Sequence, residues 1–169
     1  MKKILINAIF IFIISSISHF IYRLFPNNVI SIFFPINESI WEHLKLLFTS
    51  SLIFSIFNLI IRKDKNNFFS ITFIRSIILI TILLVLFLPI YYIFGENIIL
   101  TLILLFISII ITEIIMSKIS NKKLIKYLNF ISVFLIIISY FIFGYLTYNP
   151  PKFDLFRDPT NNSYGLFSW

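Results

Sequence analysis

Five apolar runs, each about 20 residues or longer, constrain the fold of this chain more than any other feature of its sequence. A helix needs about 20 largely apolar residues to cross roughly 30 Å of hydrocarbon, and it satisfies its own backbone where lipid cannot. The runs are too long for core helices and lack the alternation of barrel strands. We therefore expect an all-α membrane protein with five spans, at residues 4–25, 40–61, 71–94, 98–117 and 124–148.

The composition excludes a water-soluble globule. The 169 residues are 59% hydrophobic and 12% charged, with a mean hydropathy of +1.00, whereas a soluble domain is about 45–50% apolar and about 25% charged. Cysteine is absent, so disulfides, thiolate metal sites and cysteine nucleophiles are excluded as well. We expect one membrane domain over residues 1–169, in which residues 149–169 form a tail on the outer side.

Basic residues set the expected orientation, because they accumulate in cytoplasmic loops. If the amino terminus lies inside, the inner side holds Lys2, Lys3, Arg62, Lys63, Lys65, Arg75, Lys118, Lys122, Lys123 and Lys126, and the outer side holds Arg23, Lys45, Lys152 and Arg157. An odd number of spans then places the carboxyl terminus outside. We interpret the net charge of +7 as a signal of membrane topology and not as a sign of nucleic-acid binding. We expect a multi-pass protein of a bacterial cytoplasmic membrane, whose partner is the lipid bilayer.

Polar residues of the expected outer side gather at the end of the first span, at the start of the second span and in the tail. His19 interrupts the apolar first span, with Ser15 one helical turn before it and Arg23 one turn after it. Ionisable residues inside a membrane usually face the bundle interior or a water-filled cavity. The sequence therefore predicts an outward-facing polar pocket lined by Ser15, His19, Arg23, Glu38, Glu42, His43, Lys45, Asp154, Arg157 and Asp158.

Within this pocket, a carboxylate and two imidazoles could bind a divalent metal ion, with His19, Glu42 and His43 as candidate ligands. The candidate catalytic residues are Glu42 or His43 as a general base, assisted by His19 or Asp158. The spacing is not that of a zinc signature, because the adjacent Glu42 and His43 diverge by about 100° on a helix. Ser39 and Glu42 also have capping-box spacing, which explains one carboxylate without any ligand.

Two observations bear on packing inside the membrane. Arg75, near the start of the third span, and Glu113, near the end of the fourth, lie at similar depth, so we expect a structural ion pair between these helices. Small residues are scarce, with three glycines and a single alanine, Ala8, so close helix packing is limited. We expect a homo-oligomer or a membrane partner subunit to complete the packing of the bulky side chains.

Two polar motifs carry a resemblance to a known family. The run N-E-S-I-W-E-H-L-K at residues 37–45 and the pattern N-P-P…L-F-R-D-P…Y-G at residues 149–165 resemble a family of small five-span bacterial membrane proteins of unknown function. The resemblance covers essentially the whole chain, although a histidine often follows the two prolines where this chain has Lys152. It implies that the tail folds against residues 37–45, whereas the residues alone leave open a tail whose aromatic side chains dip into the membrane interface.

The sequence leaves the activity open among three hypotheses, and so does not decide whether the protein is an enzyme. The first is a non-enzymatic bundle that binds a ligand, takes part in transport or serves as an accessory subunit. The second is an intramembrane hydrolase or transferase, with or without a metal, that acts on a lipid-linked substrate at the outer leaflet. In the third, the charged residues serve only as a helix start and a latch for the tail.

Labelling of single cysteine variants tests the orientation. Because the chain contains no cysteine, a cysteine introduced at position 65 or 160 is its only thiol. We expect Thr160→Cys to react with a membrane-impermeant maleimide added to intact cells, and Lys65→Cys to react only after the membrane is permeabilised. The reverse pattern would contradict the proposed orientation.

Overall fold

The computed structural model describes residues 1–61, 67–95, 97–120 and 123–166. Within these ranges the chain is mainly helical, and the isolated bridge between Arg157 and Tyr164 is the only β-type pairing. Some residues used in the sequence analysis lie outside the described residues. They are Arg62, Lys63, Lys65 and Lys122 and the last three positions of the tail, 167–169.

Five helical segments are long and apolar enough to cross a membrane, which confirms the predicted all-α architecture with five spans. The elements are α1 (Lys2–Ser18), α2 (Ile21–Leu24), α3 (Asn28–Phe33), α4 (Ile40–Ile61), α5 (Phe68–Phe94), α6 (Ile98–Ile119), α7 (Lys123–Tyr148) and the 3₁₀ helix η1 (Asp154–Phe156). The first span consists of α1 continued by α2, and the other four are α4, α5, α6 and α7. The boundaries follow the predicted ones closely, although α5 begins at Phe68 rather than at position 71.

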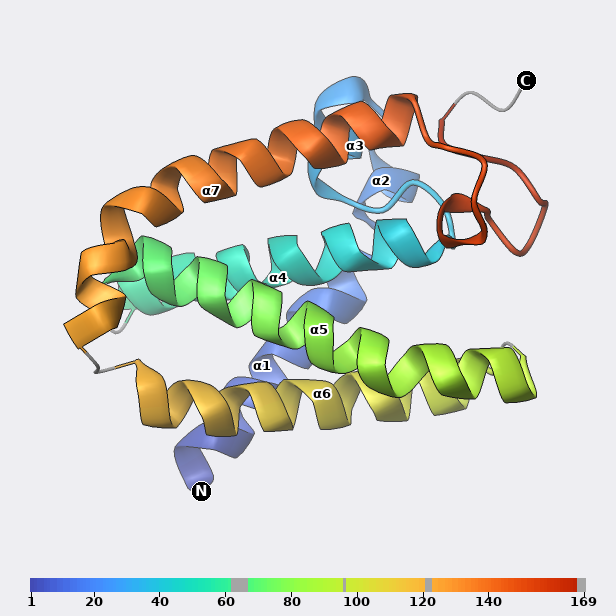
Figure 1. The fold of residues 1–169 in the computed structure, drawn as a ribbon. Coiled ribbons are helices and arrows are strands. Elements are labelled where there is room, and N and C mark those ends of the chain that lie inside the picture. Colours follow the sequence, from blue (N-terminus) through green and yellow to red (C-terminus); the bar gives the residue numbers. More distant parts are fainter. Residues whose placement is uncertain (62–66, 96, 121–122, 167–169) are drawn as a thin grey trace.

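Helix α4 is the central helix of the bundle and the most buried of the five spans. It contacts α1 and α5, while α5 also lies against α6 and α7, and α1 crosses behind to reach α6 (Figure 1). Leu47 and Phe54 of α4 lie in an apolar cluster with residues of α1, α5 and α6, and Phe48 lies in a second cluster with residues of α7. The outer faces of the bundle carry exposed apolar side chains such as Ile98 and Phe141, as a lipid-facing surface requires.

Serine supplies the small residues at the helix contacts. Ser50 and Ser51 of α4, Ser76 of α5 and Ser108 of α6 are fully buried. The hydroxyls of Ser76 and Ser108 each donate to a carbonyl of their own helix, four residues earlier, so these donors are satisfied although they are buried. Small side chains let helix backbones approach closely in a membrane. The scarcity of glycine and alanine therefore does not prevent close packing in this bundle.

A buried polar cluster joins four helices near the end of the bundle where α5 begins. Arg75 Nε donates to Glu113 Oε1 at 2.8 Å, and these are the two residues that the sequence analysis paired. Asn7 Nδ2 donates to the other carboxylate oxygen at 2.7 Å, and Arg75 Nη1 donates to Ser55 Oγ at 3.1 Å. The Arg75 guanidinium also lies 5.0 Å from the ring centroid of Phe54. The charges of Arg75 and Glu113 are thus neutralised within the bundle.

Removal of one partner from this ion pair should destabilise the protein strongly. We expect Glu113→Leu to lower the free energy of unfolding by about 3–5 kcal/mol, because Arg75 then stays buried without a counter-charge. The double variant Arg75→Leu/Glu113→Leu should recover most of the loss, since no uncompensated charge remains. Unfolding in detergent measures both effects, and equal losses in the single and double variants would contradict this account.

Candidate functional site

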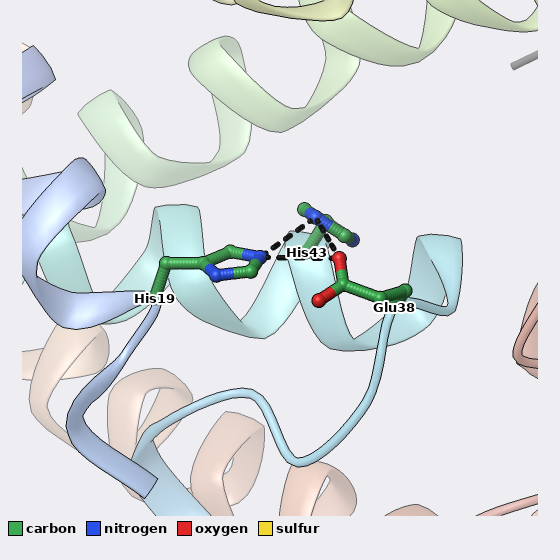
Figure 2. Close-up of side chains that lie close together, drawn as sticks. All are labelled: His19, Glu38 and His43. Atoms are coloured by element: carbon green, nitrogen blue, oxygen red, sulfur yellow. Dashed lines mark hydrogen bonds and ion pairs between the residues drawn. The ribbon is translucent and has the colours of Figure 1, made fainter. Parts of the chain in front are cut away.

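Three side chains that can ligate a metal ion meet at one end of the bundle (Figure 2). His19 is the C-cap residue of α1, His43 lies in the first turn of α4, and Glu38 lies in the segment that precedes α4. His19 Nε2 lies 3.3 Å from His43 Nε2 and 3.3 Å from Glu38 Oε2, and His43 Nε2 lies 3.7 Å from the same carboxylate oxygen. We refer to these three residues as the two-histidine cluster.

The geometry of the two-histidine cluster suits a tetrahedral metal ion. Ligands about 2.0–2.1 Å from a tetrahedral zinc ion lie about 3.3 Å from one another, and two of the three observed edges have this length. His43 Nδ1 lies 2.9 Å from the Ser39 carbonyl oxygen, which can only accept, so this ring nitrogen carries a proton and donates it. In the neutral imidazole this leaves the lone pair on Nε2, the atom that faces the cluster. Such a bond to the second nitrogen is the usual support of a metal-binding histidine.

The start of α4 explains how Glu38 reaches the histidines. Asn37 Oδ1 accepts from the Ser39 amide at 3.0 Å and forms a tight local turn, which precedes the first residue of α4, Ile40. Ser39 Oγ accepts from the Glu42 amide at 3.4 Å, which is one half of the expected capping box. Glu38 lies inside this turn and not on the helix, so its side chain is free to turn toward His43, five residues later.

Glu42 lies apart from the histidines, in a buried network that fills its acceptor positions. Its carboxylate forms an ion pair with Lys45 Nζ at 2.5 Å, and it accepts from Thr147 Oγ1 at 3.0 Å and from the Ile36 amide at 3.0 Å. Lys45, with no exposed surface, also donates to Thr147 Oγ1 at 2.8 Å and to the Ser31 carbonyl at 2.6 Å. Glu42 therefore does not join His19 and His43. Glu38 occupies the place beside the two histidines where the sequence analysis had expected Glu42.

The helix α3 is a short element that the sequence analysis did not foresee. The Asn27 side chain accepts from the first-turn amides of Val29 and Ile30 and so caps its start. Thr49 of α4 donates to the Phe33 carbonyl at 2.6 Å, at the end of α3. In Figure 1, α3 lies beside α7, and the two helices are in contact. The segment between the first two spans is thus bonded to α4 and packed against α7.

The described part of the tail packs against the start of α4. The Trp41 ring lies 5.0 Å, between centroids, from the Phe156 ring of η1, which is buried. Asp158 is also buried. One of its carboxylate oxygens, Oδ1, accepts from the Thr160 amide and hydroxyl, and the other, Oδ2, lies 3.5 Å from the Glu38 amide nitrogen. The tail therefore lies over the segment that carries Glu38, as the resemblance implied.

Gly165 closes the tail against the end of α7. Its φ of +63° lies in the left-handed region that favours glycine, and a Cβ there would lie 2.6 Å from the Thr147 carbonyl oxygen. The next amide, of Leu166, donates to this same carbonyl at 3.2 Å. A side chain at position 165 would therefore separate the tail from α7.

The remaining predicted pocket residues lie at different places. Asp154 and Arg157 are exposed and form an ion pair with each other at 3.3 Å, so they do not join the two-histidine cluster. Ser15 is buried one turn before His19, and its hydroxyl has no hydrogen-bond partner among the described residues. Arg23 is close to the cluster: it lines a hollow of about 210 Å³ together with His19, Phe20, Tyr22, Pro35, Ile36, Asn37 and Glu38.

Glu38 is the most exposed member of the cluster, with 46% of its side chain accessible. A hydrogen bond from the His19 ring lowers the pKa of its carboxyl group below the usual range, although partial burial acts in the opposite direction. The charges of His19, His43 and Arg23 also lower it. The Glu38 carboxylate is therefore ionised, and able to ligate a cation, at neutral pH.

The fold and the site define a multi-pass helical membrane protein with a cluster of potential metal ligands at one end of the bundle. Residues 1–166 match a family of unknown function, DUF6512, and the chain belongs to that family. This confirms the expectation of a family of unknown function whose similarity covers the whole chain. No curated protein and no solved structure matches the chain.

Acid should weaken the fold through Glu38. Because its pKa is lowered in the folded state, Glu38 stabilises the fold above its unfolded pKa, near 4.5, and this contribution is lost as the pH falls through the folded pKa. We expect the wild-type protein to lose stability more steeply below pH 4.5 than Glu38→Gln, with a chelator present in both samples. Thermal unfolding in detergent over a pH series measures the difference, and parallel curves would contradict it.

Proposed function

We propose that this protein binds one divalent metal ion, such as zinc, through His19 Nε2, Glu38 Oε2 and His43 Nε2. The observation that supports the proposal is the convergence of these three ligand atoms, one from the end of α1 and two from the start of α4, with two of the three separations close to those of a tetrahedral site. Two imidazoles and a carboxylate are a common ligand set for zinc. The bond from His43 Nδ1 to the Ser39 carbonyl prepares one ligand in the required tautomer.

We further propose that the site opens to the outer side of a bacterial cytoplasmic membrane. The distribution of lysine and arginine along the sequence favours an inner amino terminus, and the end of α1 and the start of α4 then lie on the opposite side. In that orientation the metal ion would come from outside the cell. The ligand set contains no thiolate, so it would tolerate an oxidising environment.

Metal content of the purified protein tests the proposal. We expect about one metal ion per chain after purification in detergent without a polyhistidine tag, measured by inductively coupled plasma mass spectrometry. His43→Gln should weaken the affinity by about 100-fold or more, since even residues that only support a ligand contribute about 10–100-fold. Glu38→Gln should act in the same direction, because it removes the only anionic ligand.

Asp154→Asn is the matched control. It also neutralises a carboxylate in the polar part of the chain, but Asp154 is paired with Arg157 and is not in the cluster. We expect this variant to keep the metal content of the wild-type protein. A wild-type protein without metal, or a His43→Gln variant with unchanged content and affinity, would defeat the proposal.

A metal-dependent hydrolase that acts on a lipid-linked substrate is the second candidate. Three protein ligands leave one position of a tetrahedral ion for water or substrate, as in catalytic zinc sites, and the hollow of about 210 Å³ adjoins His19 and Glu38. Bound zinc would lower the pKa of a water molecule and make it a nucleophile at neutral pH. Incubation of the metal-loaded protein with phospholipid vesicles separates the candidates, because only a hydrolase releases a product.

A further inference from the structure

The hollow beside the two-histidine cluster has polar groups that the metal site does not use. His19 and Glu38 belong to both the hollow and the cluster, so an ion held by the cluster would lie at the wall of the hollow. The volume of about 210 Å³ leaves room for a ligand group larger than a water molecule. The chemistry of the other wall residues therefore indicates which group would fit.

Arg23 provides a positive charge in this hollow. It lies in α2 and acts on the Glu38 carboxylate through its charge, but within the described part of the chain it forms no ion pair at contact distance and donates no side-chain hydrogen bond. The other arginines described differ in this respect, because Arg75 is paired with Glu113 and Arg157 with Asp154. A guanidinium presents two parallel N–H groups that match the oxygens of phosphate or carboxylate.

Asn37 adds a neutral donor to the same wall. Its Oδ1 is taken by the Ser39 amide, whereas its Nδ2 is buried and has no acceptor among the described residues. A buried N–H group without an acceptor is costly, and because Nδ2 is enclosed in the unliganded structure, a bound oxygen would accept from it after the Asn37 side chain rotates toward the hollow. The Glu38 carboxylate in the same wall would be neutralised by the bound metal ion, so Arg23 and Asn37 are the groups left to contact a ligand. Both offer N–H donors, which favours a ligand rich in acceptor oxygens.

The surroundings of the hollow are apolar and exposed. Phe20, which lines it, is 53% exposed, and Leu24 and Phe25 are 68% and 63% exposed. These side chains belong to the end of the first span, where a membrane protein meets the lipid headgroups. A ligand with a charged head and an acyl chain could bind the hollow with its head and keep its chain in lipid.

We infer that the hollow binds the phosphate group of a lipid, next to the metal ion. This inference rests on the proposed function, since the ion supplies part of the positive charge. Arg23 binds two phosphate oxygens, and Asn37, once its amide has rotated toward the hollow, donates to a third. The acyl chain lies along Phe20 and Leu24. Inorganic phosphate has the same phosphate chemistry but no acyl chain. A comparison of its affinity with that of a phospholipid therefore distinguishes a lipid site from a site for a free anion.

Calorimetric titration of the zinc-loaded protein in detergent tests the inference with two probes, inorganic phosphate and short-chain phosphatidic acid. We expect Arg23→Gln to weaken phosphatidic acid binding about tenfold or more, the effect of losing one charge-assisted pair. Arg157→Gln, the control, removes an arginine that is already paired with Asp154 and should leave the affinity within about twofold. Arg23→Lys should retain part of the affinity, because it keeps the charge.

The zinc content of each sample separates the two proposals. Two results overturn the inference but leave the metal site in place. In the first, the protein holds one zinc ion per chain but binds neither probe. In the second, it holds zinc, and Arg23→Gln and Arg157→Gln change the affinity for phosphatidic acid equally. Absence of zinc from the loaded wild-type protein overturns the proposed function itself. Equal affinities for the two probes overturn the assignment to a lipid, and a clear preference for phosphatidic acid supports it.

Discussion

The buried pair of Glu42 and Lys45 determines the arrangement of the polar end of the bundle. Lys45 has no exposed surface, so its ammonium group must be neutralised and hydrogen-bonded within the protein. Glu42, the Ser31 carbonyl and Thr147 meet this requirement, and they bring together α4, α3 and α7. The Ile36 amide binds the same carboxylate, which anchors the chain just before the turn that carries the cluster. The position of Glu38 thus depends on a charge pair that takes no part in the cluster itself.

Two adjacent residues of α4 consequently face different partners. Glu42 points to the network with α3 and α7, whereas His43 points to the end of α1, as the turn of about 100° per residue requires. An apolar pair in place of Glu42 and Lys45 could pack equally well, as replacements of buried ion pairs often do. It could not accept from the Ile36 amide or donate to the Ser31 carbonyl. The charged pair is therefore suited to fixing the path of the connecting segment.

The spans were predictable because hydropathy and length depend only on local sequence, and the closeness of Arg75 and Glu113 followed from their equal depth. The choice between Glu38 and Glu42 was not predictable in this way. It depends on the path of residues 26–39, where α3 forms and the Ile36 amide meets Glu42. The cap by Asn27 was the one local signal of α3. Contacts between the tail and Trp41 join distant parts of the sequence, and only the resemblance indicated them.

The contact between Trp41 and Phe156 sets an order of assembly. Trp41 belongs to the second span, whereas Phe156 follows the fifth, so more than half of the chain must be synthesised between the two partners. His19 and His43 can meet as soon as the first two spans are paired. The segment that carries Glu38 gains its cover only when the tail has emerged and Gly165 has docked on α7. During biosynthesis, the two histidines can therefore meet before the tail covers the segment that carries Glu38.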